Sequence, residues 1–115
     1  MNENESEYYD AMLDLLEWIW GKGFMAPGGE GNVDRLVSRR DIQGKRVLDI
    51  GSGLGGPVFI LAEKYGAQVT GTDLEPHLVA RATDRARELG LDGQAEFIQV
   101  QAGPLDFADE TFDLV

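Results

Sequence analysis

Residues 47–57, Val-Leu-Asp-Ile-Gly-Ser-Gly-Leu-Gly-Gly-Pro, decide the fold of this chain. The first four are typical of a buried strand, a glycine-rich turn follows, and Pro57 favours the start of a helix. Glycine has no Cβ, so the turn can adopt positive φ and a ligand can approach its backbone. We expect the N–H groups at the helix start to be free and to point towards that ligand. The stretch therefore predicts a ligand site between a strand and a helix.

The residues around this stretch predict an alternation of strands and helices. Four short runs rich in apolar and β-branched residues are expected to form strands: 45–50, 67–72, 95–100 and 111–115. Amphipathic patterns predict helices between the first three, over 56–65 and 76–89. Such an order requires right-handed crossovers and a mainly parallel sheet. The predicted fold class is α/β, Rossmann-like, with helices on both faces of the sheet.

The N-terminal part predicts a helical cap. A helix is expected over 7–20, with an apolar stripe formed by Met12, Leu13, Leu16, Ile19 and Trp20. Its acids Glu7, Asp10, Asp14 and Glu17 fall on the other side, which predicts a solvated face. A glycine-rich loop and a short helix over 32–40 follow. We therefore predict a cap over 1–43 and a Rossmann-like half-domain over 44–115.

The composition narrows the classes of function. The chain has 115 residues, 43% hydrophobic and 27% charged, which predicts one folded domain. A net charge of −11 disfavours nucleic acid as a partner. There is no cysteine, and the single histidine, His77, is expected to face solvent, so no metal site is predicted. The acidic N-terminus and the lack of an apolar run of about 20 residues predict a cytoplasmic protein without membrane contact.

Two acids flank the glycine loop in the sequence. Asp49 lies inside the apolar first strand, where a carboxylate is costly unless cations or donors surround it. Asp73 ends the second strand, a position that typically holds two ribose hydroxyls, and Leu74 can offer an apolar face to adenine. The structural alternative for Asp73 is a helix cap or an Asx turn before Pro76.

The glycine spacing alone leaves two cofactors open. Gly51, Gly53 and Gly56 also satisfy the dinucleotide fingerprint, so an NAD(P)-dependent oxidoreductase is one alternative. Asp49 favours S-adenosylmethionine. The carboxylate would attract the ammonium and sulfonium groups of this cofactor, whereas it would repel a pyrophosphate.

Three motifs, VLDIGSGLGG, GTDLEP and DFADETFDLV, are similar to those of class I Rossmann-like small-molecule methyltransferases, over roughly residues 44–115. The resemblance implies that Asp49, Gly51 and Gly53 surround the methionine end of the cofactor. It implies also that Asp73 holds the ribose and that Gln101, at a position commonly occupied by Asp, accepts from adenine. The full set of predicted cofactor contacts is Asp49, Gly51, Ser52, Gly53, Asp73, Leu74, Gln101 and Ala102.

Residues 7–31 resemble the lid segment of phosphoethanolamine N-methyltransferases. On that resemblance Tyr8 falls on the catalytic tyrosine, and Phe24 and Met25 fall where the lid touches the cofactor. The alternative is that Tyr8 and Tyr9 only staple the first helix to the sheet. Trp18 and Trp20 could enclose a methylated cation, although core packing is the favoured interpretation.

The predicted function is S-adenosylmethionine-dependent methyl transfer to a small amine such as phosphoethanolamine. A non-catalytic module that retains the cofactor pocket is a further alternative. The sequence stops at Val115, inside the fourth expected strand, so we expect only the N-terminal part of the fold. An exposed sheet edge would then favour a homo-oligomer.

Overall fold

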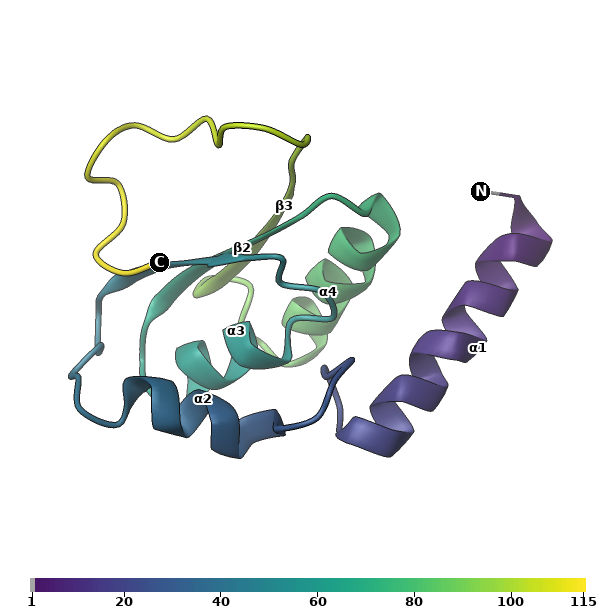
Figure 1. The fold of residues 1–115 in the computed structure, drawn as a ribbon, viewed down its shortest axis with the longest axis horizontal. Helices are drawn as coiled ribbons and strands as arrows, with labels where there is room; N and C mark the ends of the chain where they lie inside the picture. Colours follow the sequence, from purple (N-terminus) through teal and green to yellow (C-terminus); the bar gives the residue numbers. More distant parts are fainter. Residues whose placement is uncertain (1) are drawn as a thin grey trace.

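A computed structural model describes residues 2–115 (Figure 1). Its elements are, in order, α1 (Glu3–Trp20), α2 (Gly29–Val37), β1 (Arg46–Ile50), α3 (Gly56–Glu63), β2 (Gln68–Asp73), α4 (Pro76–Glu88) and β3 (Ala95–Gln99). The predicted alternation of strands and helices is confirmed, with α1 beginning four residues and α2 three residues earlier than expected. None of the helices described in residues 2–115 is long and apolar enough to cross a membrane.

The three strands form a parallel sheet in the order β1-β2-β3, with Val47 opposite Val69 and Val69 opposite Ala95. These three residues face one side and share a core with side chains of α2, α3 and α4. The described helices that pack on the sheet therefore cover one face, where the sequence predicted helices on both. Right-handed crossovers that advance from β1 to β3 in one direction place α3 and α4 on the same side.

The fourth expected strand, 111–115, is reduced to one parallel bridge between Leu114 and Val47. The N–H of Leu48 donates to the carbonyl of Leu114 at 2.9 Å. Leu114 lies on the side of β1 opposite β2, so the chain order reverses beside β1. In open parallel sheets ligands bind at the carboxyl ends of the strands near such a reversal.

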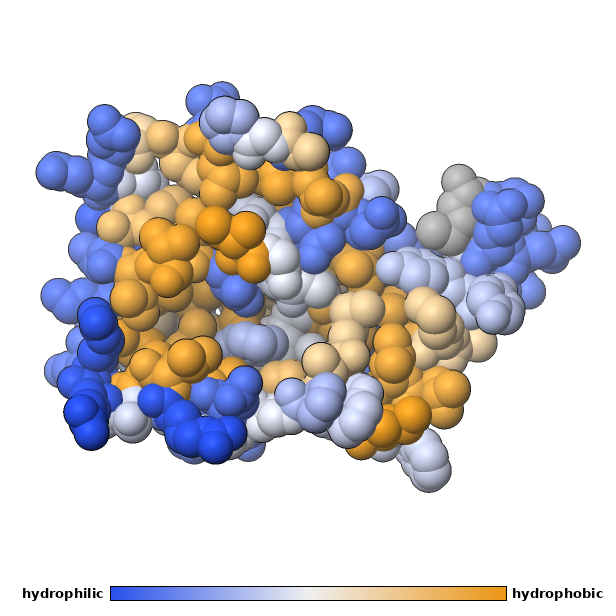
Figure 2. All heavy atoms as spheres, viewed as in Figure 1, coloured by the Kyte–Doolittle hydropathy of each residue, from blue (hydrophilic) through white to orange (hydrophobic). Residues whose placement is uncertain are grey.

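Helix α1 is an arm beside α4, joined to the rest through residues 21–28 (Figure 1). Of its side chains only Leu13 is fully buried, against Leu54 and Leu78. The predicted apolar stripe is confirmed for Leu13 and Leu16, which pack in this cluster, and is wrong for Met12, Ile19 and Trp20, which are exposed. Trp18 is also exposed, so the favoured core role of the two tryptophans is wrong too. Figure 2 shows the resulting hydrophobic surface at the C-terminal end of α1.

Candidate functional site

The glycine loop is tied to the end of β2. The N–H groups of Gly51 and Ser52 both donate to the carbonyl of Thr72 at 2.8 Å. The N–H of Gly53 donates to Oδ2 of Asp73 at 2.9 Å. The buried hydroxyl of Ser52 donates to the same Thr72 carbonyl at 3.3 Å, so it faces the protein interior. These bonds bring the glycine loop and Asp73 together at the carboxyl edge of the sheet.

Asp49 and Asp73 form an acidic pair at this edge. Burial, followed by the charge of Asp73, raises the pKa of Asp49 above its ordinary value of 3.8. Within residues 2–115 no cationic group offsets these two effects. Oδ1 of Asp73 accepts the N–H of Glu75 at 3.0 Å, so the Asx turn foreseen as an alternative is present. Each carboxylate oxygen of Asp73 retains a second lone pair, so the turn leaves room for a ligand hydroxyl.

The N–H groups of the glycine loop are largely used within the protein, which contradicts the prediction that they are free. Besides the bonds above, Gly55 donates to the carbonyl of Ser52 at 2.9 Å, and Gly56 donates to that of Gly23 at 2.8 Å. A pyrophosphate needs several free donors at such a loop. The loop is therefore poorly suited to a dinucleotide.

The solvent-exposed rim of the carboxyl edge of the sheet contains four of the predicted contacts: Gly51, Leu74, Gln101 and Ala102. Gly51 has a φ of 73°, which favours glycine, and a Cβ built there would meet no protein atom within 4 Å. Leu74, Gln101 and Ala102 are exposed. The N–H of Val100 donates to the carbonyl of Asp73 at 3.0 Å and holds the segment after β3 beside that residue.

The two tyrosines of α1 point in different directions. Tyr8 is 76% exposed, and the structure does not bring it to the acidic pair. Tyr9 packs edge-on against His77, with ring centroids 5.0 Å apart. Burial, together with the charges of Glu75 and Asp73, raises the pKa of Tyr9. Tyr9 thus lies near the acidic pair, whereas the sequence analysis considered for it only the packing of the first helix against the sheet.

Residues 21–25 lie on the glycine loop. A Cβ built on Gly53 would lie 3.2 Å from Sδ of Met25, and the Phe24 ring packs beside Gly56. The resemblance placed Phe24 and Met25 where a lid meets the cofactor. That role stays a prediction, although both residues lie beside the loop that it requires.

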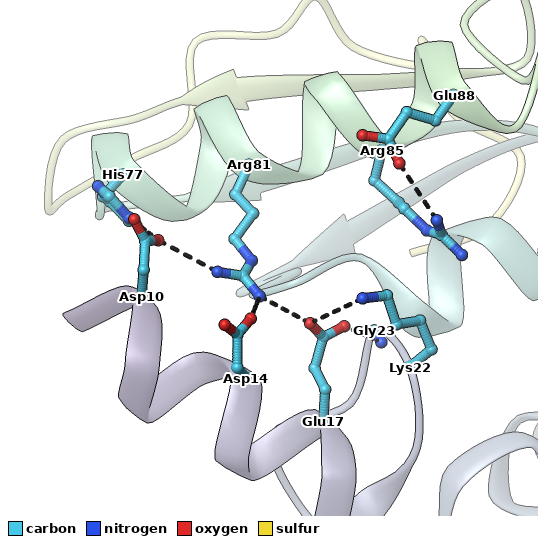
Figure 3. Close-up of polar contacts among 9 residues, drawn as sticks. All are labelled: Asp10, Asp14, Glu17, Lys22, Gly23, His77, Arg81, Arg85 and Glu88. Atoms are coloured by element: carbon cyan, nitrogen blue, oxygen red, sulfur yellow. Dashed lines mark hydrogen bonds and ion pairs between the residues drawn. The ribbon is translucent and has the colours of Figure 1, made fainter. Parts of the chain in front are cut away.

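Three of the acids predicted on the solvated face, Asp10, Asp14 and Glu17, pair with α4 (Figure 3), whereas Glu7 is exposed as predicted. Arg81 donates to Asp10 at 3.1 Å and to Glu17 at 2.8 Å, and it also bonds Asp14. His77 is only 23% exposed, with Nε2 2.7 Å from Oδ1 of Asp10, so its predicted solvent-facing position is wrong. Sequence reasoning missed this cluster because its two halves lie more than sixty residues apart. Among residues 2–115 no group of acids and histidine is arranged to hold a metal ion.

A parallel sheet, a glycine loop and an acid at the end of each of the first two strands define the class I methyltransferase fold, and solved structures agree. Phosphoethanolamine N-methyltransferase 2 of Haemonchus contortus, in complex with phosphomonomethylethanolamine and S-adenosylhomocysteine, is 31% identical with a TM-score of 0.82. The match covers 96% of this chain and 26% of that one. The chain belongs to the methyltransferase domain family, which matches residues 47–115.

Curated relatives include two kinds of methyltransferase. Phosphoethanolamine N-methyltransferase 1 of Arabidopsis thaliana is 33% identical over 110 residues, which are 95% of this chain and 22% of the relative. The 24-methylenesterol C-methyltransferase 2 of Oryza sativa subsp. japonica is 31% identical over 117 residues, with 92% of this chain and 32% of the relative covered. The chain thus spans about a quarter of the length of these relatives.

Proposed function

We propose that this chain is the cofactor-binding segment of an S-adenosylmethionine-dependent methyltransferase that acts on a small amine such as phosphoethanolamine. The observation that carries the proposal is the half-buried Asp49 beside Asp73, where no cation within residues 2–115 offsets either the burial or the repulsion. A cofactor that brings an ammonium and a sulfonium to this edge would offset both. The names of the phosphoethanolamine N-methyltransferase relatives support the amine as acceptor.

The residues of the site have distinct proposed roles. Asp49 and the glycine loop, Gly51 to Gly53, bind the methionine end, with Ser52 shaping the loop from inside. Asp73 binds the ribose, and the rim residues Leu74, Gln101 and Ala102 border the adenine. When bound, the cofactor supplies a methyl group on a positively charged sulfur. The chain binds and orients it, and residues 21–25 exclude water from the loop.

Tyr8 is the proposed catalytic residue on the acceptor side. Methyl transfer to nitrogen requires a neutral amine; a phenolic oxygen can orient an ammonium, and in its phenolate form it can accept the ammonium proton. The exposed position of Tyr8 leaves it free to meet an acceptor. Tyr8→Phe is expected to lower turnover with phosphoethanolamine more than it lowers cofactor affinity. Equal turnover of Tyr8→Phe and the unmodified chain would leave Tyr8 without a catalytic role.

The proposed cofactor is tested by calorimetric titration of the chain with S-adenosylhomocysteine and, separately, with NAD. Binding of the first and none of the second is expected, because the two carboxylates can bind its ammonium and its ribose hydroxyls, whereas the loop offers a pyrophosphate few donors. Tight NAD binding alone would favour an oxidoreductase. Cofactor binding with no methylation across a broad panel of amines would favour a non-catalytic module.

A further inference from the structure

Arg81 connects α4 to α1 through three carboxylates (Figure 3). Asp10 and Asp14 are well exposed, but the side chain of Glu17 is only 9% exposed. A charge pair of this burial is costly to separate, because each partner would be left desolvated and unpaired. Glu17 is therefore the strongest of the three connections.

Glu17 also holds the chain that follows α1. Its Oε2 accepts the backbone N–H of Gly23, and Lys22 Nζ lies 3.7 Å from Oε1. Although burial acts in the opposite direction, the hydrogen bonds from Gly23 and Arg81 keep the pKa of Glu17 below its ordinary value. One carboxylate thus fixes both the helix and the turn after it.

Gly23 links the Glu17 carboxylate to the glycine loop. Its carbonyl accepts the N–H of Gly56 at 2.8 Å, at the first residue of α3. A Cβ built on Gly56 would lie 2.5 Å from that carbonyl oxygen, so the two backbones are in direct contact. Two residues further on, Met25 lies against Gly53. Residues 21–25 are therefore tied to the glycine loop at Gly23 and again at Met25.

Apolar packing also contributes here: Leu13 is the fully buried side chain of α1, Met25 packs against its cluster, and Phe24 packs against the core of the sheet. We propose that Glu17 and Arg81 form a catch that holds residues 21–25 on the glycine loop and thereby sets how slowly a bound cofactor leaves. The contacts above support the catch itself. Its effect on the release of the cofactor rests on the proposed function. Glu17 and Arg81 are positioning residues, since neither lies at the acidic pair.

Hydrogen exchange of the ligand-free chain tests the catch itself. Arg81→Met should speed exchange of the amides of residues 21–25 by about tenfold or more, because the Gly23 N–H loses a fixed acceptor. Arg85→Met is the matched control: it removes the same charge one turn along α4, where the ion pair of Arg85 within residues 2–115 is with Glu88. If circular dichroism shows that Arg81→Met does not fold, Glu17→Gln is the second variant. It preserves the shape of the side chain and should speed exchange of the same amides about threefold. Exchange equal to that of the control in the folded variants would overturn the catch.

Stopped-flow dissociation of S-adenosylhomocysteine tests the effect on the release of the cofactor. The dissociation rate should rise about tenfold in Arg81→Met and stay unchanged in Arg85→Met. Faster exchange with an unchanged dissociation rate would overturn the link to cofactor residence. If the unmodified chain binds no S-adenosylhomocysteine, the proposed function and this link both fall, while the exchange result still decides whether the catch exists.

Discussion

Asp49 is a half-buried carboxylate that faces a second acid, Asp73. Its pKa is raised in the folded protein by burial and by Asp73. The folded state thus binds this proton more tightly than the unfolded chain does, so the contribution of Asp49 to stability is full below pH 3.8 and is lost as the pH rises through the folded pKa. At neutral pH the ionised Asp49 destabilises the ligand-free protein.

Asp49→Asn should therefore raise the melting temperature of the ligand-free chain at pH 7 by about 2–5 °C, measured by calorimetry. The gain should shrink as the pH falls towards 3.8, because the raised pKa of Asp49 favours the protonated carboxyl in the folded protein. Asp92→Asn removes the same charge from an exposed position and should leave the melting temperature nearly unchanged. A lower melting temperature for Asp49→Asn would mean that the carboxylate is already satisfied within the protein.

At the scale of single elements, α3 depends on a glycine at its first residue. Gly56→Ala places a methyl group against the Gly23 carbonyl and should destabilise the protein by about 1–3 kcal/mol. Gly31 lies inside α2, and a Cβ there would meet nothing within 4 Å. Gly31→Ala should therefore stabilise by about 0.5–1 kcal/mol. Urea denaturation of both variants measures the difference, and equal effects would contradict the close contact between Gly23 and Gly56.

The elements themselves were predictable, and their relative placement was less so. The strand, glycine loop and helix of 47–57 follow from local patterns, because apolar runs and glycine turns encode their own conformation. The orientation of α1 does not follow from local patterns. It depends on Arg81, which is distant in the sequence and which no local pattern marks as a partner of α1. The N–H groups of the loop were predicted free because their acceptors, Thr72, Asp73 and Gly23, lie outside it.

At the scale of the whole molecule, the sheet has an edge at β3. In residues 2–115 no strand pairs with the far side of β3, and unpaired edges favour association. We expect self-association of the chain to increase with concentration in sedimentation experiments. Ile98→Lys, which adds the charge that natural edge strands use for protection, should shift the protein towards monomer. A monomer at every concentration would contradict self-association through the β3 edge.

The overall fold was predictable and the full site was not. The parallel α/β class follows from the order of the elements, but the side on which the helices pack depends on the direction in which the strands advance. The division into a cap over 1–43 and a half-domain over 44–115 stays a prediction, and Val33 and Val37 of α2 share the core of the sheet. The acidic pair was visible in the sequence because carboxylates at strand ends are conspicuous among apolar residues.

The most direct test of the central claim is the affinity of S-adenosylmethionine for the chain with and without the Asp73 carboxylate. Calorimetric titration of Asp73→Ala should show binding weaker by about 1.5–3 kcal/mol than that of the unmodified chain, because charge-assisted hydrogen bonds to the ribose are lost. Circular dichroism confirms that the variant keeps its fold. Equal affinities would contradict the claim that the acids at the carboxyl edge bind an adenosyl cofactor.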